Sequence, residues 1–166
     1  SLWDFLTDTE WTPLFAKPRY GILPLVVGTL TVTGVSLAVA IPVGTVSAIW
    51  LSEFAPPRAR EVLKPMLELL TAVPTVVFGY FALTYFTPNV LNGVFNLDVT
   101  VFNGLAGGII VGIMIVPTIA SVAEDALTAV PHALREGAFG LGASKRQVST
   151  RVVVPAALSG IVASIV

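Results

Sequence analysis

The sequence has no cysteine and a single histidine, His132. The absence of cysteine excludes a thiolate nucleophile or a thiolate metal site, and one histidine does not build a histidine-based metal site or catalytic triad. Charged residues make up only 11% of the chain, against about a quarter in ordinary soluble domains. A net charge of −1 provides no clustered basic surface for nucleic acid. No residue set suggests catalysis or metal binding, so an enzyme is the least favoured class.

Charge-free runs are the main feature that is present. Residues 20–52, 69–97, 99–123 and 152–166 contain no charged side chain, and the mean hydropathy of the chain is +0.88. A membrane-spanning helix needs about 20 apolar residues. We therefore expect an all-α integral membrane protein with helices over residues 21–51, 65–87 and 105–122, and a fourth beginning near Val152. The chain starts without Met and ends inside an apolar run, so we expect a fragment with membrane helices missing at both ends.

Lysine and arginine indicate the orientation of these helices. The connections 52–64 and 123–151 hold seven of the nine basic residues, whereas residues 1–20 hold only Lys17 and Arg19 and residues 88–104 hold none. Basic residues concentrate in cytoplasmic loops. The two basic connections are therefore expected in the cytoplasm, and the other two segments outside.

Small residues recur along the first and third spans at three- and four-residue steps, which places them on one helix face. In the first span they include Thr29, Thr33 and Ser36, followed by Ala40, Gly44 and Ser47, and in the third Gly104, Gly108 and Gly112. Such faces let membrane helices approach closely. The pattern favours helix packing, and a polar translocation path along Thr29, Thr33 and Ser36 is the alternative.

The cytoplasmic connection 123–151 begins with two adjacent carboxylates, Glu124 and Asp125. Neighbouring residues in a helix point to different faces. We expect a solvated helix end here rather than a catalytic pair.

The rest of this connection carries signals for two short helices. Pro131 suits a first helical position, and Leu134, Ala138 and Leu141 form a short apolar stripe. Gly142 stands where a left-handed residue would end the helix. Ser144 and Gln147 have the spacing of a capping box that starts a second helix. The pattern predicts a rigid elbow that projects into the cytoplasm and docks a partner protein.

The spacing within this elbow resembles the EAA loop of ABC importer permeases. Glu136-Gly137-Ala138 is followed by three residues, Gly142, nine residues and Val152-Val153-Val154-Pro155. The family pattern has Ala, Ile and Leu where this chain has Gly137, Val152 and Val154. The resemblance implies that the loop forms the coupling helix that contacts the ATP-hydrolysing subunit. The residues it assigns to this contact are Arg135, Glu136, Gly137, Ala138, Gly142, Ala143, Ser144, Lys145 and Pro155.

Most of the chain also resembles PstC-type permeases of phosphate importers. The segments that carry this resemblance include Trp11-Thr12-Pro13, 20–24, 51–56, 73–79, 112–117 and 138–144. The resemblance implies a MetI-like permease bundle, with about four of six transmembrane helices in this chain, in the bacterial inner membrane. It also implies alternating access, no catalytic or metal site here, and ATP with Mg on a separate ATPase.

The partners implied are an ATP-binding subunit dimer, a PstA-type second permease, an external phosphate-binding protein and the lipid bilayer. Several alternatives stay open at this point. These alternatives are a permease for sulfate, molybdate or phosphonate, the PstA-type sister subunit, and a channel without an ATPase.

Overall fold

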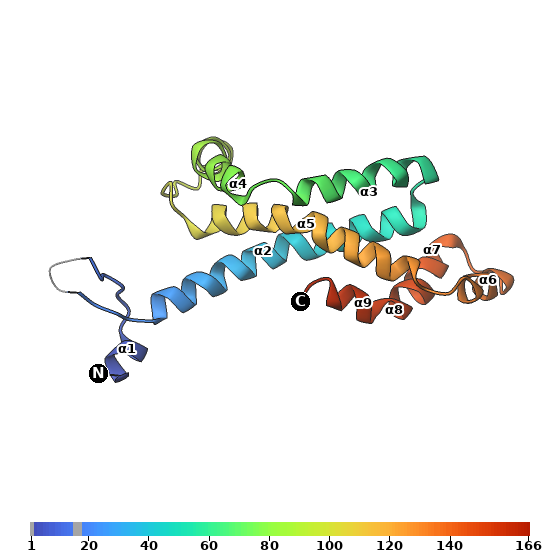
Figure 1. Cartoon of the computed structure of the whole chain (residues 1–166), viewed down its shortest axis with the longest axis horizontal. Coiled ribbons are helices and arrows are strands. Elements are labelled where there is room, and N and C mark those ends of the chain that lie inside the picture. Colours follow the sequence, from blue (N-terminus) through green and yellow to red (C-terminus); the bar gives the residue numbers. More distant parts are fainter. Residues whose placement is uncertain (1, 15–17) are drawn as a thin grey trace.

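The structure is a computed structural model that describes residues 2–14 and 18–166, and within these residues it is almost entirely helical (Figure 1). An isolated antiparallel bridge joins Trp11 to Tyr20. The elements in chain order are α1 Leu2–Thr7, α2 Leu23–Ile49, η1 Trp50–Phe54, α3 Pro57–Thr71, α4 Thr75–Phe81, η2 Ala82–Val94, α5 Gly104–Thr128, α6 His132–Gly140, α7 Lys145–Val148, η3 Ser149–Val153, α8 Val154–Ala156 and α9 Leu158–Ala163, where η marks a π-helix. The expected all-α fold class is confirmed.

Among the residues that the structure describes, two helices are long and apolar enough to cross a membrane. The first runs over Leu23–Phe54, combining α2 and η1, and the second is α5, Gly104–Thr128. They confirm the first and third predicted spans. Helix α5 continues six residues past the predicted end at Val122, because Ala123, Glu124 and Leu127 in its last turns are buried against other elements.

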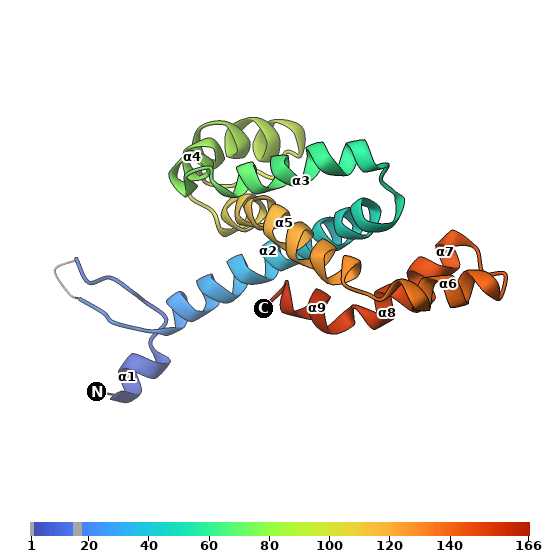
Figure 2. The ribbon, with the colours of Figure 1, turned by 45° about the vertical axis from the view of Figure 1, so that its right-hand side comes forward.

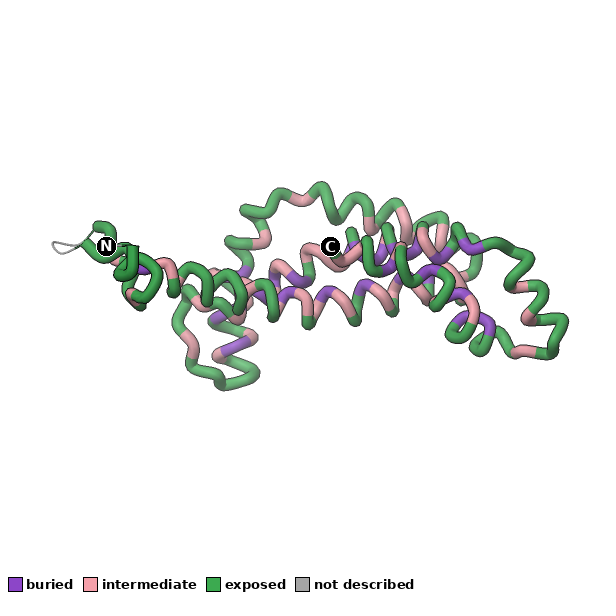
Figure 3. The backbone as a smooth tube through the Cα atoms, turned by 90° about the horizontal axis from the view of Figure 1, so that it is seen from below, coloured by how far each residue is buried: buried purple, intermediate pink, exposed green. Residues whose placement is uncertain are grey.

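The packing of α2 against α5 organises the molecule, and Figure 3 shows buried residues concentrated along these central helices. Ser36, Ala40 and Gly44 of α2 are all buried. A Cβ placed on Gly108 of α5 would lie 2.6 Å from the Cβ of Val35, so the two backbones approach too closely for a larger residue. The small-residue face predicted from the sequence therefore packs helices together.

The helix predicted over residues 65–87 is broken into two arms. Helix α3 ends at Thr71, and the helix formed by α4 and η2 leaves it at an angle of 83°. Pro74 lies at the break with ψ of 131°. Proline has no N–H to continue a helix and disfavours helical backbone in the residue before it. The bent pair is a third span only if both arms together cross the membrane.

The connection predicted over residues 52–64 is also shorter than expected. The backbone turns at Ala55 and Pro56, and α3 begins at Pro57, which suits a first helical position. Helix α3 then runs back alongside α5 (Figures 1 and 2). Its side chains Arg60 and Lys64 consequently face the last turns of α5.

The basic connections lie together at one end of the molecule. In Figures 1 and 2, α6 and α7 lie near the turn from η1 to α3, whereas α1 and the start of α5 lie toward the opposite end. This arrangement matches the predicted alternation of cytoplasmic and outer segments. Lys17, counted among the outer basic residues, lies outside the described residues.

The fourth helix begins earlier than Val152. A continuous helical stretch starts with α7 at Lys145, widens into η3 and continues into α8, and α9 then packs against α5. Pro155, near the start of α8, has no N–H to donate to the preceding turn. The π-helical turn just before it is the kind of local widening that accompanies such a break in a helix ladder.

Candidate coupling elbow and its ion-pair support

The predicted elbow is present, and its bend is defined by backbone hydrogen bonds. Helix α6 ends at Gly140, and the N–H of Ala143 donates to the carbonyl of Ala138 at 3.1 Å while the N–H of Gly142 donates to Phe139 at 2.9 Å. This pair of bonds is a Schellman motif, which needs a left-handed residue after the helix. Gly142 has φ of +81°. The glycine therefore stands at the position where a side chain would be strained.

Helix α7 begins immediately after this turn through a capping box. The N–H of Ser144 donates to Oε1 of Gln147 at 2.8 Å, and the N–H of Gln147 donates to Oγ of Ser144 at 3.4 Å. These bonds satisfy amide groups that a helix start leaves unpaired. The capping prediction is confirmed. Pro131, in contrast, is the N-cap of α6 with ψ of 134°, one residue before the first helical position where it was expected.

The elbow has an inner face and an outer face. Ala138 and Ala143 pack against a buried cluster made by α2, α5 and the chain after Lys145. The outer face exposes Glu136 and Gly137 together with three apolar side chains: Leu134 at 48%, Phe139 at 48% and Leu141 at 91%. Of the predicted stripe, Ala138 is partly buried whereas Leu134 and Leu141 are exposed. The outer apolar side chains form the surface available to a partner.

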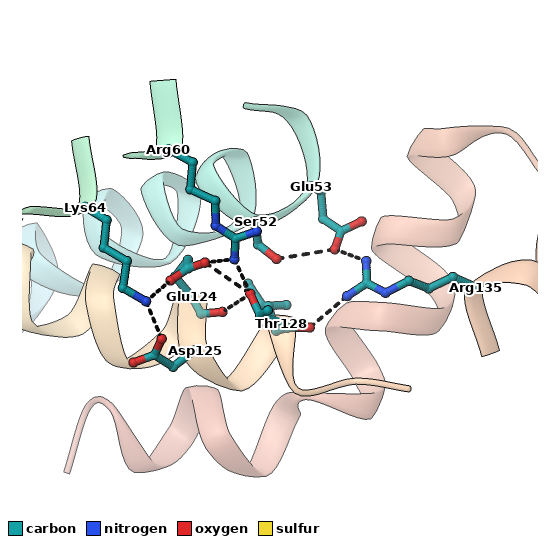
Figure 4. A network of polar contacts seen from close by, with 9 residues as sticks. Ser52, Glu53, Arg60, Lys64, Glu124, Asp125, Thr128 and Arg135 are labelled. Carbon is teal, nitrogen blue, oxygen red and sulfur yellow. Dashed lines mark hydrogen bonds and ion pairs between the residues drawn. The ribbon is translucent and has the colours of Figure 1, made fainter. Parts of the chain in front are cut away.

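Arg135 lies on the inner side of the elbow. Its Nη1 donates to Oε1 of Glu53 in η1, and its Nη2 donates to the carbonyl of Leu127 at 2.8 Å (Figure 4). The Arg135 and Glu53 side chains are 16% and 6% exposed. Arg135, which the resemblance assigns to the ATPase contact, therefore makes its contacts within its own chain.

Lys145 also contacts η1. Its Nζ lies 5.5 Å from the centre of the Phe54 ring, which is cation–π distance. Ser144 and Gly142 are exposed, as is Pro155 further along the chain. A Cβ on Gly137 would meet nothing within 4 Å, so the alanine of the family pattern would fit there.

A second ion-pair group joins α3 to the last turns of α5. Glu124 is fully buried, and its carboxylate pairs with Arg60 and with Lys64, whose Nζ lies 2.8 Å from Oε2 (Figure 4). Lys64 also pairs with Asp125, and Arg60 also donates to Thr128. The expectation of a solvated helix end is wrong for Glu124. Burial of a carboxylate requires paired charge, and α3 supplies it.

Sequence reasoning missed this group although a signal existed. Arg60 and Lys64 are four residues apart, so they share one face of α3, and Glu124 and Asp125 are the acidic residues at the end of the charge-free run 99–123. This group has two acidic and two basic side chains, which favours pairing between them. Their partners depend on how α3 folds back along α5, which the sequence pattern alone does not show.

The candidate path residues are separated by the structure. The Ser36 hydroxyl donates to the carbonyl of Gly108 at 3.0 Å inside the α2–α5 interface. Thr29 and Thr33 are exposed on the outer half of α2, where they line a shallow hollow with Pro24, Gly28 and Val32. Ser36 thus serves packing, and Thr29 with Thr33 are the hydroxyls still accessible to a path.

Comparison with known proteins places this architecture in a family. Residues 40–166 match the model described as binding-protein-dependent transport system inner membrane component. The chain is 39% identical over 163 residues to a probable ABC transporter permease protein, YqgH, of Bacillus subtilis, covering 98% of this chain and 52% of that protein. It is also similar to phosphate transport system permease proteins PstC of Haemophilus influenzae (33% identity, 97% of this chain and 56% of that protein) and PstC 1 of Mycobacterium tuberculosis (34%, 98% and 57%).

The chain spans about half the length of these curated relatives. No solved structure matches it. The match of the family model to residues 40–166 includes the end of the first long helix from Ala40 onward, all of α5, the elbow and the ion-pair group. The chain therefore belongs to the binding-protein-dependent transport system inner membrane components, which are permease components of ABC transporters.

Proposed function

We propose that this chain is part of a permease subunit that moves inorganic phosphate across the bacterial cytoplasmic membrane by alternating access, driven by ATP hydrolysis on a separate subunit. The observation that carries the proposal is the elbow. It combines a rigid Schellman turn, a capping box and an exposed apolar face at the basic end of the bundle. The choice of phosphate is supported by the names of the PstC relatives.

The exposed side chains define how the elbow would contact an ATPase. Leu134, Phe139 and Leu141 offer an apolar surface, and Glu136 adds a carboxylate beside it. A short helix with exposed apolar side chains fits a groove on a partner. We assign this contact to an ATP-binding subunit dimer, which holds ATP and Mg. Its closure would displace α6 and α7, and the attached helices would reorient.

The remaining components follow from the same proposal. A second, PstA-type permease would complete the path beside Thr29 and Thr33, and an external phosphate-binding protein would deliver substrate at the end that carries α1. No side chain described within the long spans is a lysine or arginine that would hold phosphate directly. Substrate selection by the binding protein is therefore part of the proposal.

The test is uptake of radiolabelled phosphate by cells that carry the intact parent gene, with and without Glu136→Lys. We expect energy-dependent uptake in the unmodified strain and its loss in the variant, because the reversed charge lies on the face offered to the ATPase. Glu61→Lys is the matched control, since Glu61 is also exposed but belongs to α3 and not to the elbow. Uptake that continues in the Glu136→Lys strain would contradict the coupling role.

A second candidate is a permease for another oxyanion. It is favoured by the relative at 39% identity, whose name gives no substrate. Competition by unlabelled sulfate, molybdate or phosphonate in the same assay distinguishes these substrates. Loss of labelled phosphate uptake only with unlabelled phosphate supports the first candidate.

A further inference from the structure

Glu53 and Phe54, the last two residues of η1, are both held by cations from the elbow. Arg135 of α6 pairs with Glu53, and Lys145 of α7 lies over the Phe54 ring. The two cations come from the helices on either side of Gly142. We call these four residues the 53–54 junction. The junction connects both arms of the elbow to the end of the first long span.

The Arg135 guanidinium joins three elements at once. Besides Glu53, it contacts the carbonyl of Leu127, which belongs to the last turn of α5. The last four carbonyls of a helix lack partners within it and carry partial negative charge, so a cation is favoured there. Both charged side chains of the pair are almost entirely covered. Separating a buried ion pair costs free energy, because each charge is then left in the interior without its partner. The pair therefore fixes the relative positions of the two helices that carry it.

The junction is distinct from the surface that faces a partner. Leu134, Glu136 and Leu141 are exposed, whereas Arg135 points inward from the same helix. Figure 4 shows its guanidinium directed toward Glu53. The junction is also separate from the Glu124 group, which joins α3 to α5. It is the set of polar contacts that connects the elbow to the first span.

The geometry points to Arg135 and Lys145 as positioning residues that make the elbow and the inner end of α2–η1 move together. This inference rests on the proposed function. A displacement of α6 by the ATPase would then pass directly to the helix that carries Thr29, Thr33 and Ser36. Without the junction, Gly142 and residues 129–131 would absorb the displacement, and ATP hydrolysis would continue without substrate movement.

The experiment measures phosphate uptake and ATP hydrolysis by the full transporter complex reconstituted in vesicles. Arg135→Ala is expected to lower the ratio of uptake to hydrolysis by about tenfold, a usual size for coupling between sites. Arg146→Ala is the matched control, because Arg146 is an exposed cation on α7 outside the junction. An Arg135→Ala complex with the unmodified ratio would overturn the inference.

A double substitution separates a coupling role from a general loss of structure. Arg135→Ala alone leaves Glu53 buried without its partner, whereas Glu53→Ala with Arg135→Ala removes both charges. The double variant is expected to assemble better than either single variant yet keep the low ratio. Recovery of the full ratio in the double variant would show that the unpaired charge of Glu53 alone had lowered the ratio of uptake to hydrolysis. That result would overturn the inference. Lys145→Met, at an exposed side chain that does not endanger folding, is expected to lower the ratio, and Lys145→Arg to retain it.

A distance measurement tests the inference without reference to the substrate. The chain has no cysteine, so spin labels can be attached to cysteines placed at the exposed positions Ala133 on α6 and Val43 on α2. In the unmodified complex the distance between the labels is expected to stay constant between nucleotide-free and ATP-bound states. It should change with nucleotide when Arg135 and Lys145 are both replaced by alanine. Absence of phosphate uptake by the complex contradicts the proposed substrate. A label distance that stays constant with nucleotide after both replacements contradicts the role proposed for the junction.

Discussion

The carboxylate of Glu124 has no exposed surface, and its Oε2 accepts a hydrogen bond from Nζ of Lys64 at 2.8 Å. Arg60 pairs with the other oxygen, which also accepts from the Thr128 hydroxyl at 3.0 Å. These ion pairs hold α3, a helix with charged residues, along the apolar helix α5. The pairing explains how an acidic residue occupies the interior of a membrane protein near the end of a spanning helix.

Glu124→Gln is expected to destabilise the protein by roughly 3 kcal/mol, because the substitution leaves two cations facing a buried neutral group. Thermal unfolding of the purified protein in detergent measures the effect. Glu68→Gln is the control, since Glu68 is exposed on the same α3 helix. Equal unfolding temperatures for both variants would show that the group contributes little to stability.

Gly108→Ala is expected to destabilise the α2–α5 packing by about 1–3 kcal/mol, the usual cost of forcing an added group into a packed interface. Its new Cβ would lie 2.6 Å from Val35, whereas a Cβ on the neighbouring Gly107 would meet nothing within 4 Å. Gly107→Ala is therefore the matched control. Resistance to protease digestion in membranes compares the two variants, and the packing model fails if both are cleaved alike.

Gly142→Ala should cost about 1–2 kcal/mol, since an L-residue is strained in the left-handed conformation. Gly140→Ala, two residues away in α6, should be neutral or stabilising by up to about 1 kcal/mol, because alanine favours a helix. Neither added methyl group would contact another residue within 4 Å, so the comparison isolates backbone conformation.

A bulkier residue at position 142 is expected to uncouple phosphate uptake while membrane insertion stays intact. Uptake assays and accessibility of the loop to labelling measure the two properties in the same cells. Normal uptake by Gly142→Val would argue that the left-handed turn is not needed for coupling.

Ser144→Ala should weaken the start of α7 by about 1 kcal/mol through loss of the capping bond. Faster hydrogen exchange at the amide of Gln147 would report this loss, because that amide donates to the Ser144 hydroxyl. Thr150→Ala is a suitable control, as the Thr150 hydroxyl donates to the carbonyl of Arg146 in the preceding helical turn at 2.8 Å. Unchanged exchange at Gln147 would count against the capping box.

The sequence by itself determined the features that depend on local chemistry. Charge-free runs longer than a bilayer requires predicted α2 and α5, and Gly142 with the Ser144–Gln147 spacing predicted the elbow. These signals are reliable because helix length, a left-handed backbone and a capping bond involve residues close together in the chain. The small-residue faces also predicted close packing, although they did not indicate that Ser36 lies inside the interface while Thr29 and Thr33 remain exposed.

Only the tertiary structure decided which charges meet. Arg135 carries no local signal that separates a partner contact from an internal one, and Glu124 resembles a solvated helix end until α3 is seen beside it. The turn at Ala55 and Pro56 directs α3 along α5, and the elbow brings Arg135 to Glu53 across 82 residues of sequence. A pattern of residue types describes which groups a helix offers. The partner that compensates a buried charge depends on the distance between helices, which the folded chain alone establishes.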